Sequence, residues 1–270
     1  MNVGFWKKLT MWTGIILLIS FLLLTIQERS SVSRLQSNTC ESIAFREQKI
    51  VPELYWEIQE NKNRTLSKMD QLALLFLNGK QTDAETLKTY KSYLKYKKED
   101  YLYLRDCLSA IWSDLQYFPV ASEDIIFENT WLAERTYGGE RLHEGCDLFG
   151  KKEVSGYYSI VSMTDGIVEK IGWLPLGGYR IGIRSPHGGY FYYAHLSGYE
   201  KEFVVGDAVK AGDILGFMGN TGYGEEGTIG QFPVHLHFGI YIKTKNQSEL
   251  SVNPYWVLKS FEKKIRKYVY

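Results

Sequence analysis

The sequence predicts an α+β protein with an N-terminal transmembrane helix, an α-helical hairpin or stalk, and a mostly antiparallel all-β domain. Three patterns predict this organisation: an uncharged apolar run at residues 9–26, apolar side chains at helical spacing at residues 41–118, and short β-prone runs separated by glycines from about residue 126. With 270 residues, the chain is long enough to bury a sizeable core. Its net charge of +1 gives no reason to expect a nucleic acid as partner.

The apolar run from Leu9 to Ile26 has the length of a bilayer-spanning helix, which is about 20 residues. Lys7 and Lys8 precede the run, and no small-x-small cleavage site follows it. We therefore expect an uncleaved, single-pass signal anchor in the cell membrane, with residues 1–8 cytoplasmic and the residues beyond about 27 outside. The alternative is a buried core helix, although such helices seldom run this long without a charge.

Helices are expected in the region 27–125. Pro52 suits the first turn of one helix, Gly79 marks the end of another, and TDAE at Thr82–Glu85 is a capping box that should start a long helix. Apolar residues then follow three or four positions apart, interrupted by Lys97: Leu87, Tyr90, Leu94, Tyr101, Leu104, Leu108, Ile111, Leu115 and Phe118. This stripe predicts packing in a hairpin or bundle, or self-association or binding of a protein partner through the stalk. Its tyrosines could instead bind glycan.

Three cysteines, Cys40, Cys107 and Cys146, are too few for a disulfide scaffold and include no CxxC pair. Outside the cytoplasm, Cys40 and Cys107 could form a bridge or could remain two unpaired, buried thiols. In an extended segment, Cys146 would face away from the neighbouring Asp147 and serve as a small core residue.

From about residue 126 the chain contains short β-rich runs such as YYSIVSM, GYFYYAHL and VHLHFGIYI. Short strands separated by glycine turns indicate an all-β sandwich or barrel-like domain, which we place at residues 126–258. After Pro254 the sequence predicts a partly amphipathic helix, and residues 259–270 form a basic C-terminal tail.

Four of the five histidines stand in sequence contexts that make chemical sense together. His235 and His237 should lie on the same face of a strand, because side chains alternate between faces. His143 and Asp147 are four residues apart in a loop leading into a strand, a spacing at which both can bind one ion. His195 ends a β-prone run that opens onto a glycine turn, which is typical of the rim of a site. Each histidine alone could be a core residue. If two histidine nitrogens and one aspartate oxygen bind a zinc ion together, they leave its fourth coordination position open.

The segments HEGCD, YAHL, GDAVKAGDILGFMGNTG and VHLHF, in this order and spacing, resemble the lysostaphin and LytM type of zinc endopeptidases, which cut peptidoglycan peptides. The resemblance covers about Glu128 to Tyr255, and the helical region and the anchor lie outside it. It implies a bacterial zinc metalloendopeptidase that hydrolyses the cross-links or stems of peptidoglycan through a zinc-activated water. A non-catalytic cell-wall scaffold or activator with the same fold is the alternative, and a missing motif residue would have favoured it.

The resemblance also implies roles for individual residues. One Zn²⁺ per chain would be bound by His143, Asp147 and His237. His195 and His235 would be the catalytic pair beside the metal. Tyr137 would face the developing oxyanion, a role for which Tyr192 and Tyr193 compete.

The chain departs from the family pattern between its TG and HLHF motifs. Members commonly have a very short link there, whereas this chain has the glycine-rich loop NTGYGEEGTIGQFPV, with Glu225 and Glu226. The loop is not a phosphate-binding P-loop, because no Gly-Lys-Ser/Thr follows. We expect it to border the substrate and to alter cross-bridge preference, or to be a plain surface insertion.

Overall fold

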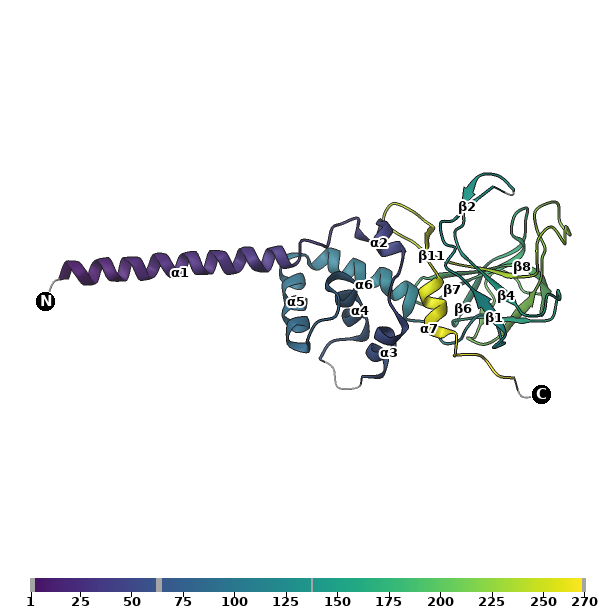
Figure 1. The fold of residues 1–270 in the computed structure, drawn as a ribbon, viewed down its shortest axis with the longest axis horizontal. Helices are drawn as coiled ribbons and strands as arrows, with labels where there is room; N and C mark the ends of the chain where they lie inside the picture. The colour runs from purple at the N-terminus through teal and green to yellow at the C-terminus, as the bar shows by residue number, and fades with distance from the viewer. Residues whose placement is uncertain (1–2, 62–64, 137, 269–270) are drawn as a thin grey trace.

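The computed structural model describes residues 3–61, 65–136 and 138–268, and it confirms the α+β fold. A long N-terminal helix leads to a group of shorter helices, and a large antiparallel sheet lies at the far end of the molecule (Figure 1). The C-terminal helix α7 (Tyr255–Phe261) lies between the helical group and the sheet.

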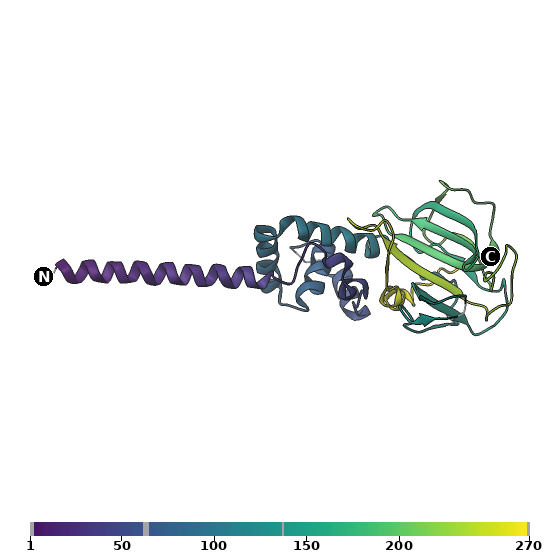
Figure 2. The same cartoon turned by 90° about the horizontal axis from the view of Figure 1, so that it is seen from above.

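Helix α1 (Val3–Ser31) contains the whole predicted apolar run and projects away from the rest of the chain in both views (Figures 1 and 2). Among the described residues it is the one helix long and apolar enough to cross a membrane, at Trp6–Ser31, and none of its most apolar stretch is buried. The alternative of a buried core helix is therefore wrong. Exposed apolar side chains of this number need an apolar environment.

The helical group comprises a short 3-10 turn and five α-helices: η1 (Thr39–Glu41), α2 (Ile43–Arg46), α3 (Pro52–Glu60), α4 (Lys68–Asn78), α5 (Asp83–Tyr96) and α6 (Lys98–Trp112). The local signals act as predicted. Pro52 stands in the first turn of α3, Gly79 ends α4 with a φ of 74°, and Thr82 and Glu85 form both hydrogen bonds of the capping box.

The prediction of one long helix after Thr82 is wrong, because Lys97 breaks it into α5 and α6. Lys97 leaves helical geometry with φ −144° and ψ 41°. The chain turns there, and the rings of Tyr93 and Tyr101 stack with centroids 5.4 Å apart. Leu115 and Phe118 lie beyond the end of α6 and pack in the core that helices and sheet share. The apolar seam thus folds onto itself, which buries more of its surface than one straight helix could.

The sheet contains ten strands, and every pairing is antiparallel, as predicted. They are β1 (Ile125–Phe127), β4 (Cys146–Gly150), β5 (Ser159–Val161), β6 (Gly166–Leu174), β7 (Gly178–Arg184), β8 (Tyr190–Tyr199), β9 (Ala208–Val209), β10 (Ile214–Met218), β11 (Leu236–Ile242) and β12 (Leu250–Val252). The main order is β1-β4-β11-β8-β7-β6-β9, and a separate hairpin pairs β2 (Glu134–Arg135) with β3 (Arg141–Leu142). The central strands β4, β11 and β8 carry the histidines discussed below.

The helical group packs directly on the sheet domain. The Arg46 guanidinium of α2 donates to the Ser251 carbonyl at 2.9 Å and lies 5.1 Å from the ring of Trp131, whose indole donates to Ser251 Oγ at 2.8 Å. At α7, the indole of Trp56 donates to the Ser260 carbonyl at 2.8 Å. The predicted helix after Pro254 is present and ends at Phe261, three residues into the stretch 259–270 expected as a basic tail.

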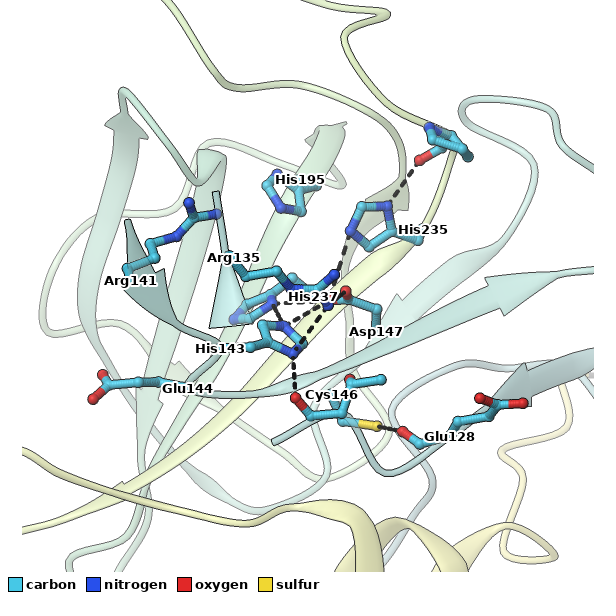
Figure 3. Close-up of polar contacts among 12 residues, drawn as sticks. Glu128, Arg135, Arg141, His143, Glu144, Cys146, Asp147, His195, His235 and His237 are labelled. Carbon is cyan, nitrogen blue, oxygen red and sulfur yellow. Dashed lines mark hydrogen bonds and ion pairs between the residues drawn. The ribbon is translucent and has the colours of Figure 1, made fainter. Parts of the chain in front are cut away.

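All three cysteines are free and buried. Cys40 and Cys107 are neighbours, and the structure holds them as two unpaired thiols. Cys146 lies in the core as predicted, where its thiol donates to the Glu128 carbonyl at 3.1 Å (Figure 3).

Candidate metal centre and active site

Strand pairing places two of the predicted metal ligands next to each other. In the ladder between β11 and β4, His237 stands directly opposite Asp147. Directly opposite residues of an antiparallel pair project to the same side, so both side chains meet on one face. His143 comes from the loop between β3 and β4, as the glycines around it predicted, and it reaches the same point.

The three donor atoms of this group form a nearly regular triangle (Figure 3). Asp147 Oδ1 lies 3.0 Å from His143 Nε2 and 3.0 Å from His237 Nδ1, and the two nitrogens are 3.0 Å apart. Among the described residues, this is the group of His, Cys, Asp and Glu side chains placed to hold one ion.

The donor set fits zinc. Ligand atoms of a tetrahedral Zn²⁺ at bond lengths of about 2.0–2.1 Å lie roughly 3.3 Å apart, so the triangle needs to open by only a few tenths of an ångström. Two imidazole nitrogens and one carboxylate oxygen are typical zinc ligands, and three of them leave a position open. The ligand roles stay a prediction that this geometry supports.

Two contacts outside the triangle orient its members. His143 Nδ1 lies 3.0 Å from the Thr130 carbonyl and 3.2 Å from Arg135 Nη2. In the tautomer in which Nδ1 donates to that carbonyl, Nε2 has its lone pair toward the ion position. Arg135 Nη2 donates to the outer oxygen of Asp147, Oδ2, at 2.9 Å, which leaves Oδ1 for the triangle. Burial alone would raise the pKa of Asp147, but the contacts of its carboxylate with His143 and His237 bring it below its usual range.

Sequence reasoning missed Thr130 and Arg135. Thr130 acts through its backbone carbonyl, so its residue type carries no signal. Arg135 lies on the β2–β3 hairpin eight residues before His143, and a single arginine in such a loop gives no periodic pattern.

His195 and His235 lie together beside the triangle, with ring centroids 4.8 Å apart. His195 Nδ1 is 2.8 Å from the Thr221 carbonyl, and His235 Nδ1 is 2.8 Å from the Pro233 carbonyl. Both carbonyls accept, so both rings are protonated at Nδ1 and have Nε2 as a free base. His235 Nε2 lies 3.7 Å from Asp147 Oδ1, which places it next to the ion position.

Burial keeps both of these imidazoles neutral. It lowers the pKa of His195 well below its ordinary value, with the nearby His235 acting in the same direction, and it also lowers the pKa of His235. Neutral imidazole is the form that accepts a proton.

The expected position of His195 at the end of a strand is wrong, because β8 continues to Tyr199. His195 instead sits at an irregularity inside the strand, with a φ of 62°, and its backbone N–H donates to the Gly177 carbonyl at 2.8 Å. A non-glycine residue in this conformation is strained by about 1–2 kcal/mol. The irregularity turns the imidazole of His195 toward His235.

The glycine-rich loop borders this pair of histidines. The ring of Phe232 lies 4.5 Å from that of His195 and 5.1 Å from that of His235, and Tyr223 stacks on His195 at 6.2 Å. Arg141 of β3 lies over the Tyr223 ring at 5.4 Å. The aromatic side chains of the loop therefore exclude water from one side of the candidate site, while Glu225 and Glu226 are exposed.

Comparison with known proteins identifies the family to which the chain belongs. The sequence profile of Peptidase family M23 matches residues 141–252. A solved structure from Ruminococcus gnavus ATCC 29149, a candidate glycyl-glycine endopeptidase named LytM, is 40% identical, with a TM-score of 0.74 and coverage of 89% of this chain and 98% of that chain. The chain belongs to peptidase family M23.

Two curated relatives match parts of this M23 chain. An L-Ala--D-Glu endopeptidase of Bacillus subtilis (strain 168) is 41% identical over 140 residues, which is 52% of this chain and 41% of that protein. Lysostaphin of Staphylococcus simulans is 34% identical over 99 residues, which is 36% of this chain and 17% of that protein. The chain thus spans less than half the length of either of these curated relatives.

The three tyrosines considered for the oxyanion, Tyr137, Tyr192 and Tyr193, differ in where they lie in this M23 protein. Tyr137 lies outside the described residues, so its predicted role stays a prediction. Tyr192 lies beside the site, with its ring 5.9 Å from that of His237. Tyr193 faces the opposite side, where its hydroxyl accepts from the Met163 N–H at 2.9 Å in the core, and it is therefore wrong as a candidate.

Proposed function

We propose that the protein is a zinc-dependent endopeptidase that hydrolyses peptide bonds of bacterial peptidoglycan. The observation that carries the proposal is the arrangement of the five side chains. Three N and O donors lie 3.0 Å apart, beside two neutral histidines whose Nε2 atoms are free. Membership of family M23 and the names of the relatives support peptidoglycan peptides as the substrate class. A non-catalytic scaffold would not need this complete set.

His143, Asp147 and His237 would hold the metal. A bound Zn²⁺ would polarise the scissile carbonyl and lower the pKa of water, from 15.7 to about 7 in the best-known zinc enzymes. The neutral imidazoles of His195 and His235 would take the proton of the attacking water at Nε2. Once charged, they would stabilise the oxyanion or protonate the leaving amine.

The aromatic wall of Tyr223 and Phe232 would strengthen these charge interactions, because it excludes water from one side of the histidine pair. The Thr221 and Pro233 carbonyls fix the rings, so no reorganisation is needed when a substrate binds. The backbone therefore sets the imidazoles before the reaction.

We further propose that α1 anchors the enzyme in the cell membrane, with the sheet domain outside the cytoplasm. The unburied apolar helix and the lysines before it support this orientation. The helical group, which packs on the sheet, would fix the distance of the site from the membrane surface.

The proposal is tested by incubating the full chain, purified in detergent, with sacculi and identifying released peptides by mass spectrometry. Release should stop with a chelator and return with added Zn²⁺. A His235→Ala variant serves as the control for contaminating hydrolases. Absence of any chelator-sensitive product from sacculi of several cross-link types would favour the scaffold instead.

A further inference from the structure

The sheet face that carries His237 also carries a partly buried arginine, Arg180, that has no acidic partner among the described residues. Strand pairing defines this face: His237 stands opposite Ala194, Gly239 opposite Tyr192, and Tyr192 opposite Gly182. Arg180 precedes Gly182 by two residues on β7, and its register with Gly172 on β6 is regular. Because side chains alternate along a strand, Arg180 projects to the same side as His237.

Arg180 lies close to the candidate active site. It falls opposite the irregularity of β8 that contains Ala194 and His195. His237, Ala194 and Arg180 therefore lie roughly side by side across three neighbouring strands, about 10 Å from first to last at the backbone. Ala194, which lies between the arginine and the histidine, has a small side chain, and the ring of Tyr192 lies on the same face.

Two nitrogens of the Arg180 guanidinium group lack hydrogen-bond partners. Its Nε and Nη1 are buried, and neither has an acceptor among the described residues. The ring of Tyr192 lies near His237, and its hydroxyl lies beside Gly177, just before β7. The Tyr192 side chain therefore extends along the strand end that carries Arg180. Burial raises the pKa of Tyr192 to about 12, and the charge of Arg180 acts in the opposite direction, as expected for two close groups.

The other two cations of this face are paired. The guanidinium of Arg184 donates to both carboxylate oxygens of Glu169 and to the Gly188 carbonyl. Lys170 forms an ion pair with Glu249. A buried arginine whose donors are unmet is energetically costly, and a carboxylate is the acceptor that matches its planar, forked geometry.

We propose that Arg180 binds a free carboxylate of the peptide substrate, and that the enzyme therefore cuts beside an acidic residue rather than within a glycine bridge. A peptide extends about 3.3 Å per residue, so a carboxylate on Arg180 belongs to a residue within about two positions of the scissile bond. The bond named for the Bacillus relative, between L-Ala and D-Glu, provides such a group, whereas a glycyl-glycine bridge does not. The inference rests on the proposed function and specifies its substrate.

The test compares three peptides with the full chain in detergent and Zn²⁺: L-Ala-D-Glu-L-Lys with its free glutamyl carboxylate, the same peptide with that group as a carboxamide, and pentaglycine. We expect the wild type to hydrolyse the acid with a kcat/KM at least about tenfold above that of the amide. Arg180→Met should bring this ratio to about one. Lys170→Met, which removes a paired cation from the same face, should leave the ratio unchanged.

A second readout does not need hydrolysis. Calorimetric binding of the acid and the amide in the presence of chelator should show the same preference in the wild type and its loss in Arg180→Met. Arg180→Gln provides a second substitution, and thermal unfolding of each variant confirms that it is folded.

The possible failures are distinguishable. Equal hydrolysis of acid and amide, preference for pentaglycine, or an unchanged ratio in folded Arg180 variants would overturn the role of Arg180 and leave the endopeptidase function intact. Preferential binding of the acid without hydrolysis of any peptide or sacculus would instead remove the proposed function and keep the carboxylate site.

Discussion

The imidazole of His237 packs against Gly145. Replacing Gly145 with alanine adds one methyl group at this contact and so tests the metal centre. A Cβ at this position would lie 2.5 Å from His237 Cε1, 2.7 Å from His237 Nε2 and 2.7 Å from the Phe238 carbonyl oxygen. The Phe238 carbonyl belongs to β11, which is paired with β4 on one side and β8 on the other, so it cannot retreat without loss of the ladder.

The size of the effect follows from these distances. Carbon atoms settle about 3.5–4.0 Å apart, so the ring of His237 must move by about 1 Å. Metal–ligand distances are held within about 0.2 Å, so such a shift removes His237 from its place in the triangle. We expect zinc affinity to fall by at least about tenfold, which is 1.4 kcal/mol, and peptide hydrolysis to fall with it.

The assay is a competition titration of Zn²⁺ against a chromophoric chelator, with the full chain in detergent. Gly198→Ala is the matched control: Gly198 lies in β8 of the same sheet, and a Cβ there would meet nothing within 4 Å. Wild-type zinc affinity in Gly145→Ala would refute the assigned position of His237 in the metal centre.

Three further substitutions test other contacts. Arg135→Gln removes the ion pair to Asp147 and should weaken zinc binding by about tenfold in the same titration; unchanged affinity would mean that Arg135 does not orient the carboxylate. Thr82→Ala removes the cap of α5 and should lower the free energy of unfolding in urea by about 1 kcal/mol with no change in zinc affinity, so a loss of zinc would contradict local capping. Trp112→Phe leaves the buried Gln48 Oε1 without its donor at 2.8 Å and should cost about 1–3 kcal/mol in urea unfolding; an unaltered midpoint would argue against this hydrogen bond.

The features that sequence predicted well depend on near neighbours in the chain. The capping box at Thr82 and the glycine stop at Gly79 are set by three or four consecutive residues. Strand alternation likewise placed His235 and His237 at one site, and the loop before Asp147 followed from its glycines. Local chemistry decides these features, so they can be read without the fold.

The features that sequence missed depend on distant parts of the chain. Lys97 ends α5 because the seam buries more surface when it folds back, which local propensity does not show. His195 adopts a positive φ inside β8, where the strand signal alone predicted an ordinary end. Arg135 and Arg180 gain their importance from what lies beside them, a carboxylate in one case and no acceptor in the other.

His237 and His235 share one face but have different tasks in the proposed mechanism. The most direct measurement is the zinc content and peptidoglycan hydrolysis of His237→Ala and His235→Ala, purified side by side with the wild type. His237→Ala should lose both the metal and the activity, whereas His235→Ala should keep about one Zn²⁺ per chain and lose the activity. Equal loss of zinc in the two variants, or hydrolysis by His235→Ala at the wild-type rate, would contradict this division of tasks.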